Sequence, residues 1–398
     1  MNKERVLLAL SGGLDTSFCA IYLDREKKME VHSAIVDTGG FQEEELEQIR
    51  QHAGRLGIVS HQVLDITADY YNRCLRYMIF GNILRNRSYP LSVSSERTFQ
   101  AMALVNHARK QGFKYIAHGS TAAGNDQVRF DLVIQVLAPE IKVITPIREL
   151  QISREDEIAY LKKEGVAMNW EQVEYSINQG LWGTSVGGKE TLTSSDELPE
   201  SAYPYPLEKE GTELINIGFE EGEPISLNGN KYEPLVVIRE LEKAAAPWGV
   251  GRDVHVGDTI IGIKGRVGFQ AAAARILIDA HLALEKHVLT RWQLHWKEQI
   301  GQWYGMFVHE AQYLEPVMRD LEKFLDSTQK TVTGEVSVRL RPYSYAVTGV
   351  QSPHDLMNSS FASYGEMNRA WSAEEVNGFT RILGNQQRIW YAVNGMEE

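Results

Sequence analysis

Short apolar runs alternate with longer amphipathic stretches along the first part of the chain. The apolar runs predict strands over residues 6–10, 31–36, 61–64, 115–118, 132–137 and 143–145. The longer stretches predict helices over residues 18–23, 43–56, 68–80 and 96–111. Strands that alternate with helices of this size form a parallel sheet with helices on both faces. The fold class predicted here is therefore α/β.

The remainder of the chain has a mixed pattern. It predicts strands over residues 214–219, 259–264, 332–340 and 343–350, one long helix from residue 270 to about residue 300, and an amphipathic helix over residues 372–383. The stop at Gly165 suggests a domain boundary, with a parallel-sheet domain over residues 1–165 and an α+β domain over residues 166–370. Residues 371–398 would form a C-terminal helix and tail. Trp371, Trp390 and Tyr391 suggest that this helix packs against another surface.

Composition narrows the possible partners. The 398 residues carry a formal net charge of −12, which argues against a broad contact with nucleic acid. No apolar run is long enough to cross a bilayer, so we expect no membrane partner. Residues 1–5 lead directly into the first strand, and Cys19 and Cys74 are too few for a disulfide framework. These features predict a cytoplasmic protein.

The stretch with the strongest functional signal is Ser11-Gly12-Gly13-Leu14-Asp15-Thr16-Ser17, between the first predicted strand and the first predicted helix. The first N–H groups of a helix lack intrahelical partners and the helix dipole is positive there, so such a turn binds phosphate. Gly12 and Gly13 let the backbone approach oxyanions closely. The hydroxyls of Ser11, Thr16 and Ser17 add donors. Asp15 can hold a metal ion or cap the helix.

This loop is neither a Walker A motif nor a dinucleotide-binding fingerprint. It resembles the pyrophosphate loop of enzymes that split ATP into AMP and pyrophosphate, which include several synthetases and tRNA-modifying enzymes.

A second polar stretch, residues 118–131, follows a predicted strand and so should lie at the same carboxyl edge of the sheet. Asn125 can donate and accept, which suits a ureido or amide group. Arg129 offers a rigid fork for a carboxylate or phosphate, and Asp126 can receive an ammonium group. His118 could act as a base, although a lone histidine at a strand end is more often structural.

Two further stretches carry weaker signals. Residues 87–97 form an extended loop before a helix, in which Tyr89, Ser94 and Arg97 can bind anions. Residues 175–185 hold Ser176 and Ser185 around an aromatic, glycine-rich turn.

Together these stretches resemble the argininosuccinate synthase family along nearly the whole chain. The matching motifs are residues 9–17, Tyr89-Pro90-Leu91, residues 118–121 with 124–130, Tyr175-Ser176-Ile177 with Leu181-Trp182-Gly183, and Gly249-Val250-Gly251-Arg252. Several motifs in the right order are more specific than the glycine loop alone. The resemblance implies ligation of citrulline to aspartate with ATP and Mg²⁺, release of AMP and pyrophosphate, and a homotetramer that uses the C-terminal helix. It also implies that residues 1–165 are the nucleotide-binding domain and residues 166–370 the synthetase domain.

The resemblance also implies site residues. The ATP-binding set is Ala9, Leu10, Ser11, Gly12, Gly13, Leu14, Asp15, Thr16, Ser17, Val36 and Gly119. The substrate-binding set is Thr121, Asn125 and Asp126 for aspartate, and Tyr89, Ser94, Asn125, Arg129, Ser176 and Ser185 for citrulline. We assign catalysis to Ser11, Asp15, Asp126 and Arg129, and predict no dedicated set of metal ligands. The family usually has alanine where Val36 stands, a change that a backbone contact tolerates.

The expected reaction needs hydrogen-bond donors and residues that position the substrates, and these motifs supply both. A urea carbonyl is a poor electrophile, so its oxygen should first attack the α-phosphorus of ATP. The aspartate amine then displaces AMP from the activated carbon. Such an enzyme positions reactants and neutralises phosphate charge, so we expect no covalent enzyme intermediate.

Three positions depart from the family pattern. Gly257 replaces a glutamate and Phe269 a tyrosine that contact citrulline, and Thr184 replaces an arginine. Without that glutamate, the substrate's α-ammonium loses its obvious partner, and a buried unpaired ammonium is costly. Either Asp253 or Asp258 supplies the charge, or the substrate arrives with its α-nitrogen acylated.

Two other kinds of protein share part of this pattern. A different ATP pyrophosphatase, such as an amidotransferase or a tRNA thiolase, would need an N-terminal catalytic cysteine or a basic surface with paired cysteines. A nucleotide-binding sensor would not need the polar residues 121–129.

Overall fold

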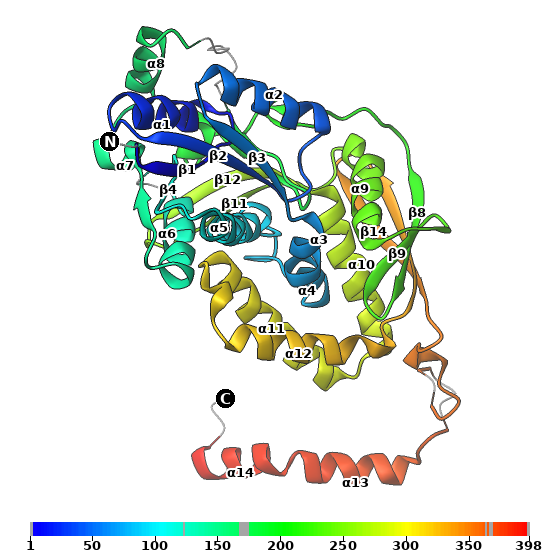
Figure 1. Ribbon diagram of the computed structural model, residues 1–398. Coiled ribbons are helices and arrows are strands. Elements are labelled where there is room, and N and C mark those ends of the chain that lie inside the picture. The colour runs from blue at the N-terminus through cyan, green and yellow to red at the C-terminus, as the bar shows by residue number, and fades with distance from the viewer. Residues whose placement is uncertain (1–2, 122–123, 167–174, 363, 366–368, 396–398) are drawn as a thin grey trace.

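A computed structural model describes residues 3–121, 124–166, 175–362, 364–365 and 369–395 of the protein. Its N-terminal part is built on a parallel sheet in the strand order β3-β2-β1-β4-β5 (Figure 1). The strands are β1 Arg5–Ala9, β2 Glu30–Asp37, β3 Ser60–Asp65, β4 Tyr115–Ala117 and β5 Lys142–Ile144. Together with the antiparallel sheets described below, this sheet confirms the predicted fold class.

Alternate residues of β1 face two different layers of helices. Val6, Leu8 and Leu10 pack in one cluster with α1 (Leu14–Arg25), α2 (Glu43–Arg55), α7 (Pro146–Leu150) and α8 (Arg154–Lys163). Leu7 packs in the other cluster with α5 (Ser92–Gln111) and α6 (Asp126–Leu137). Successive strand side chains point to opposite faces, so a fully apolar strand needs helices on both sides.

The strand predicted over residues 132–137 is wrong, because these residues form the second half of α6. Their apolar, partly β-branched composition is typical of a buried strand, and a short run cannot be told from a buried helix by periodicity. Tertiary structure decides the matter, since β4 and β5 are parallel neighbours and their connection must cross over the sheet, usually as a helix.

The helix predicted over residues 68–80 is one irregular helical segment. It consists of α3 (Thr67–Tyr70), a π-helical turn (Tyr71–Leu75) and α4 (Arg76–Phe80). π-helical turns occur mostly as local bulges within α-helices.

Two further sheets follow in the second part of the chain. One is antiparallel, in the order β10-β9-β8-β13-β14, and consists of β8 (Glu213–Glu220), β9 (Glu223–Leu227), β10 (Asn230–Lys231), β13 (Gly334–Arg341) and β14 (Ser344–Gln351). The other has the order β11-β12-β7-β6, and consists of β6 (Ser176–Asn178), β7 (Thr184–Gly187), β11 (Arg252–Asp258) and β12 (Lys264–Gln270). The strand predicted over residues 259–264 is wrong: it is mostly the turn between β11 and β12, where Gly262 has a φ of +81°.

The long helix predicted from residue 270 is two helices, α10 (Ala272–Val288) and α11 (Arg291–His309). Thr290 ends the run because its side chain accepts from the Gln293 N–H, and the Gln293 side chain accepts from the Thr290 N–H. This reciprocal capping box starts a new helix. α9 (Pro234–Ala245) packs against α10, and α12 (Val317–Thr328) packs against α11.

The C-terminal arm, α13 (Ala373–Leu383) with α14 (Asn385–Asn394), lies apart from the body of the molecule (Figure 1). The larger hydrophobic cluster runs without a break from α5 and α6 into β8 and α10, so the division near Gly165 stays a prediction. None of the helices in the described ranges has the length and apolarity that crossing a membrane requires.

Candidate active site

The glycine loop sits between β1 and α1 as predicted. Gly12 has a φ of +80°, and a Cβ there would lie 3.1 Å from Ile49 Cγ1, so this position favours glycine for both backbone and space. Gly13 is the N-cap of α1, and Ser11 and Gly13 are exposed. The loop therefore presents the N-terminus of a helix to solvent, with the Ser11 and Thr16 hydroxyls 3.2 Å apart.

Ser17 is used within the loop itself. Its Oγ donates to the Gly13 carbonyl at 2.8 Å and lies 2.8 Å from His52 Nε2. Because that hydroxyl proton is already donated, His52 must donate from Nε2, as a neutral ring does. Burial, and then the charge of Arg55, lower the pKa of His52, which favours the neutral ring. α2 thus holds the glycine loop through one histidine.

The two polar loops meet at the carboxyl edge of the sheet. β4 pairs with β1 in parallel, so the loops that follow Ala9 and Ala117 are neighbours. A Cβ on Gly119 would lie 3.1 Å from Asp15 Cβ, which shows how closely the second loop approaches α1. Val36 is buried near the end of β2, on the other side of β1.

Asp15 interacts with α8. Burial raises the pKa of Asp15 against the lowering effects of Arg154 and Glu157. Burial, and then the charge of Asp15, raise the pKa of Glu157 to about 8. Glu157 is therefore the partner that keeps a proton at neutral pH. The roles predicted for Asp15, in catalysis and in binding ATP, stay predictions.

His118 holds the end of β4. It is buried, its Nε2 lies 3.0 Å from Asp131 Oδ1, and its Nδ1 accepts from the Ser120 N–H at 3.4 Å. Arg148 pairs with the same Asp131 at 2.7 Å. Both ring nitrogens have hydrogen-bond partners, as expected for a histidine with a structural role.

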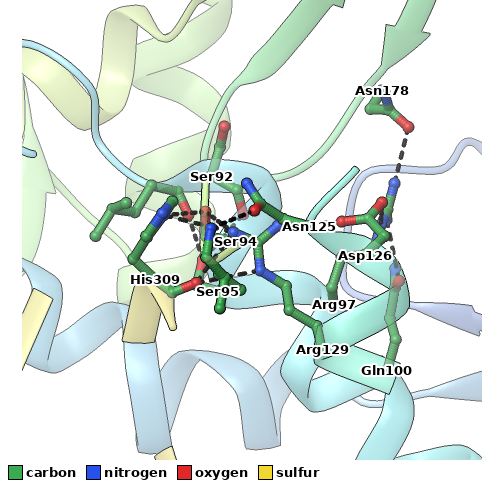
Figure 2. Close-up of polar contacts among 12 residues, drawn as sticks. Ser92, Ser94, Ser95, Arg97, Gln100, Asn125, Asp126, Arg129, Asn178 and His309 are labelled. Atoms are coloured by element: carbon green, nitrogen blue, oxygen red, sulfur yellow. Dashed lines mark hydrogen bonds and ion pairs between the residues drawn. The ribbon is translucent and has the colours of Figure 1, made fainter. Parts of the chain in front are cut away.

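The start of α6 gathers several of the predicted substrate residues (Figure 2). Asp126 accepts from Arg97 Nε at 3.0 Å and from Arg129 Nη1 at 3.1 Å. Burial alone would raise the pKa of Asp126, but the two guanidinium groups outweigh it and hold that pKa below its usual value. Asn125 Oδ1 accepts from the Ile260 N–H at 2.8 Å, which ties the β11–β12 turn to this helix start. Thr121 is exposed on the preceding loop.

Arg129 is buried and fully engaged (Figure 2). Its Nη2 donates to Ser94 Oγ at 2.9 Å and to the His309 carbonyl at 3.1 Å. Burial, followed by the charges of Arg129 and Arg85, lowers the pKa of His309 to about 3, so its ring is neutral. Arg129 therefore links α6, α5 and the end of α11.

The β11-β12-β7-β6 sheet brings the two predicted serines together. Directly opposed residues of antiparallel strands share a face, as do residues two apart. Asn178 opposes Ser185, and Ser185 opposes Phe269. One face of the sheet therefore carries Ser176, Asn178, Ser185, Phe269, His255 and Gly257, which we call the serine face.

The serine face is turned toward α5 and the loop before it. Asn178 Oδ1 accepts from Arg97 Nη2 at 2.8 Å, as Figure 2 shows. The Tyr89 ring packs against those of His255 and Phe269, with centroid distances of 5.1 and 5.2 Å. Thr184 lies on the opposite face of β7, because it precedes Ser185 by one residue. Of the three departures from the family pattern, only Gly257 and Phe269 belong to this face.

Glu96 is a buried carboxyl group beside these residues. A Cβ on Gly180 would overlap its Oε1, so the carboxyl group packs directly against the Gly180 backbone. Burial raises the pKa of Glu96 to about 8, although Arg97 and the Thr38 hydroxyl lower it. Glu96 is therefore largely protonated at neutral pH.

Sequence reasoning missed four of these groups: His52, Glu96, Asn178 and His309. His52 and His309 lie in helices outside every motif, whereas Glu96 and Asn178 lie in stretches where other residues drew attention. Each of the four meets its partner through tertiary contacts. The sequence indicated Arg97 only as a weak anion-binding residue. The adjacent charged residues Glu96 and Arg97, near a predicted helix start, were the local signal that pointed here.

Comparison with known families agrees with this geometry. Residues 5–167 match the family model described as arginosuccinate synthase N-terminal HUP domain, and residues 175–390 match the arginosuccinate synthase C-terminal domain. The chain belongs to the argininosuccinate synthase family. Members of this family are ligases that form a C–N bond, as predicted from the motifs.

Individual relatives cover the whole chain. The argininosuccinate synthase of Dictyoglomus thermophilum is 36% identical over 397 residues, which cover 99% of each chain. That of Methanocaldococcus jannaschii is 36% identical over 391 residues, covering 97% of this chain and 98% of the relative. That of Xanthomonas campestris pv. campestris is 35% identical, covering 99% of this chain and 100% of the relative.

Proposed function

We propose that this protein joins a ureido amino acid of the citrulline type to aspartate, using ATP and releasing AMP and pyrophosphate. The observation that carries the proposal is the meeting of three surfaces at one sheet edge. They are the helix N-terminus after Gly13, the Asn125–Arg129 segment at the start of α6, and the serine face. Full-length relatives named argininosuccinate synthase support the same activity.

The glycine loop would bind the ATP phosphates. Its free helix N–H groups and the exposed Ser11 face solvent, and helix N-termini favour anions. Val36 and Gly119 border the loop from neighbouring strands and would line the nucleotide. Ser17 contributes mainly by holding the loop, since its hydroxyl proton is donated to the Gly13 carbonyl.

The amino acids would lie between α6 and the serine face. Ser94, Ser176 and Ser185 would orient the ureido substrate with Tyr89, and Asn125 would contact its ureido group. Arg129 and Asp126 would contact the substrates, and the ion pair between these two side chains would keep both of them in place. Thr121 and Asp126 would receive aspartate.

The reaction then needs orientation and charge neutralisation. The ureido oxygen attacks the α-phosphorus of ATP and expels pyrophosphate into the field of the glycine loop. The aspartate amine attacks the ureido carbon and displaces AMP. Holding the reactants in the correct orientation lowers the entropic part of the activation barrier. N–H donors stabilise the negative charge that develops on phosphate.

Mg²⁺ would enter with ATP. Magnesium commonly keeps several waters and binds through substrate phosphates with one or two carboxylates. Asp15 is the carboxylate of the loop, it lies in the first turn of α1, and its side chain hydrogen-bonds to that of Glu157. Bound Mg²⁺ would neutralise phosphate charge during expulsion of pyrophosphate.

The proposed assembly is a homotetramer. Val376, Phe379 and Leu383 recur at helical spacing along α13 and are exposed. Ile389, Trp390 and Val393 continue the exposed apolar surface on α14. Surfaces of this kind mark protein contacts, and a second copy of the chain fits the family assembly. A cytoplasmic location is proposed with it, since Cys19 and Cys74 are buried and unpaired.

The test is a pyrophosphate-release assay with ATP, Mg²⁺, aspartate and citrulline-type substrates, each omitted in turn. We expect AMP and pyrophosphate in equal amounts, only when both amino acids are present. Formation of ADP, or no turnover with every ureido compound tested, would refute the proposed function.

A further inference from the structure

The region beside Tyr89 on the serine face holds more hydrogen-bond donors than acceptors. A Cβ on Gly257 would lie 2.6 Å from His255 Nε2 and 3.6 Å from Arg85 Nε. These two nitrogens therefore face the same small region next to Gly257. Within the described residues, neither ring nitrogen of His255 has a hydrogen-bond partner, and only 7% of this residue is exposed.

Arg85 is the permanent charge of this region. Its Nη2 donates to the Asp258 carbonyl at 3.2 Å, whereas its buried Nε has no partner among the described groups. Burial lowers the pKa of Arg85, against the opposing effect of Glu310 and Asp258. Burial and the charge of Arg85 also lower the pKa of His255, so an incoming anion would meet one cation and one neutral donor.

Most carboxylates around this region are paired with cations. Glu310 forms no ion pair within the described residues, and its charge partly offsets the lowered pKa of Arg85. Asp126 is paired with Arg97 and Arg129. Asp258 is paired with Lys264 at 2.7 Å and alternates away from His255 along β11. Asp253 shares the serine face, but its carboxylate lies 3.9 Å from Arg275 Nη1.

We propose that the ureido substrate carries on its α-nitrogen an acyl group with a free carboxylate, which binds Arg85 and His255. This inference rests on the proposed function and specifies the substrate class of the same site. An amide nitrogen has no positive charge, so it needs no carboxylate where Gly257 stands. The free carboxylate supplies the acceptor that Arg85 Nε and His255 Nε2 lack.

The α-carboxylate of an unmodified substrate could also reach these donors. It would then bring its α-ammonium into a region that holds Arg85, Arg129, His255 and His309. An ammonium placed there would have to compete with Arg85 for Glu310, or with Arg275 for Asp253. Like-charge placement and desolvation both oppose that arrangement.

The experiment compares citrulline, N-acetylcitrulline and N-succinylcitrulline in pyrophosphate release, with ATP, Mg²⁺ and aspartate held constant. We expect kcat/KM for the N-succinyl compound to exceed that for citrulline by at least about tenfold, the effect of one charge-assisted hydrogen bond. Preference for free citrulline would overturn the inference and leave the proposed function intact. Failure of all three compounds would refute the proposed function instead.

Two variants isolate the carboxylate contact. Arg85→Gln should lower kcat/KM for N-succinylcitrulline by about tenfold and leave N-acetylcitrulline unchanged. His255→Gln, which keeps an N–H donor, should retain most of the N-succinyl preference. Arg87→Gln, an exposed neighbour, is the matched control and should change neither substrate. Equal turnover of the two acylated compounds by the unaltered enzyme would overturn the assigned contact.

Discussion

Arg129 Nη1 lies 3.1 Å from Asp126 Oδ1, one turn away on α6, and this ion pair joins two residues proposed to contact different substrates. Arg97 holds the other carboxylate oxygen at 3.0 Å. A carboxylate held between two guanidinium groups can neither rotate nor take up a proton easily. The site geometry is therefore set before any substrate binds.

Replacing Arg129 with lysine should disrupt this arrangement. Lysine keeps the charge but loses the fork that reaches Asp126, Ser94 and the His309 carbonyl together. We expect kcat/KM for the ureido substrate to fall at least about tenfold, the effect of losing one or more charge-assisted hydrogen bonds. Arg109→Lys, at the exposed pair with Glu140, is the control and should be nearly neutral. Equal kinetics for both variants would contradict the positioning role.

His52→Ala should weaken ATP binding without removing any predicted phosphate contact. The substitution leaves Ser17 Oγ without its donor and frees the glycine loop from α2. We expect KM for ATP to rise by about tenfold, with a smaller change in kcat, as expected from the loss of a buried hydrogen-bond partner. His52→Gln, which retains a donor, should recover part of the loss. An unchanged KM for ATP in His52→Ala would show that α2 does not hold the loop.

Glu96 should make the protein less stable as pH rises through the neutral range. Its folded pKa of about 8 exceeds the ordinary value of 4.5, so the folded state binds more protons between these values. The free energy of unfolding therefore falls as pH rises from the lower value toward the higher one. Glu96→Gln should remove this part of the pH dependence and should be the more stable protein at pH 8. Parallel stability profiles for the two proteins, from denaturant unfolding, would exclude a raised pKa.

The buried pair Lys297–Glu285 makes a separate stability prediction. The two side chains are 2.8 Å apart and almost fully buried between α10 and α11, and Asn82 and Gln329 also donate to Glu285. Lys297→Met leaves that carboxylate without its cation and should cost about 3–5 kcal/mol of unfolding free energy. Adding Glu285→Gln should recover part of this loss. The exposed pair of Lys323 with Asp320 provides the control, because Lys323→Met should cost less than about 1 kcal/mol.

The C-terminal arm should control assembly. Every side chain of α13 and α14 is exposed, so a charge there has no effect inside one chain. Phe379→Asp with Leu383→Asp should shift the oligomer to smaller species, measured by analytical ultracentrifugation. Asn377→Asp adds a charge on the same helix and should leave the mass unchanged. The original mass in the double variant would rule out this surface as the contact.

Several features of the site could be predicted from the sequence because they are local. An apolar strand, two glycines and a helix start are neighbours in the chain, so the phosphate-type turn needs no distant contact. The two polar loops also met as expected, since adjacent parallel strands bring their carboxyl ends to one edge. The family resemblance rested on such local motifs and is confirmed over both halves of the chain.

Features that depend on long-range contacts could not be predicted. Residues 132–137 are helical because the β4–β5 connection requires a crossover, and their own composition does not show it. His52 reaches Ser17, and His309 reaches Arg129, only through packing of separate helices.

The sequence by itself determined the phosphate-type loop, the α/β class and the family, because these depend on neighbours in the chain. Tertiary structure decided which side chains share the serine face, because strand register sets the direction of each residue. It also placed Arg85 and His255 beside Gly257. The charge that a substrate would meet there depends on two segments, the loop with Arg85 and strand β11, which only the folded chain brings together.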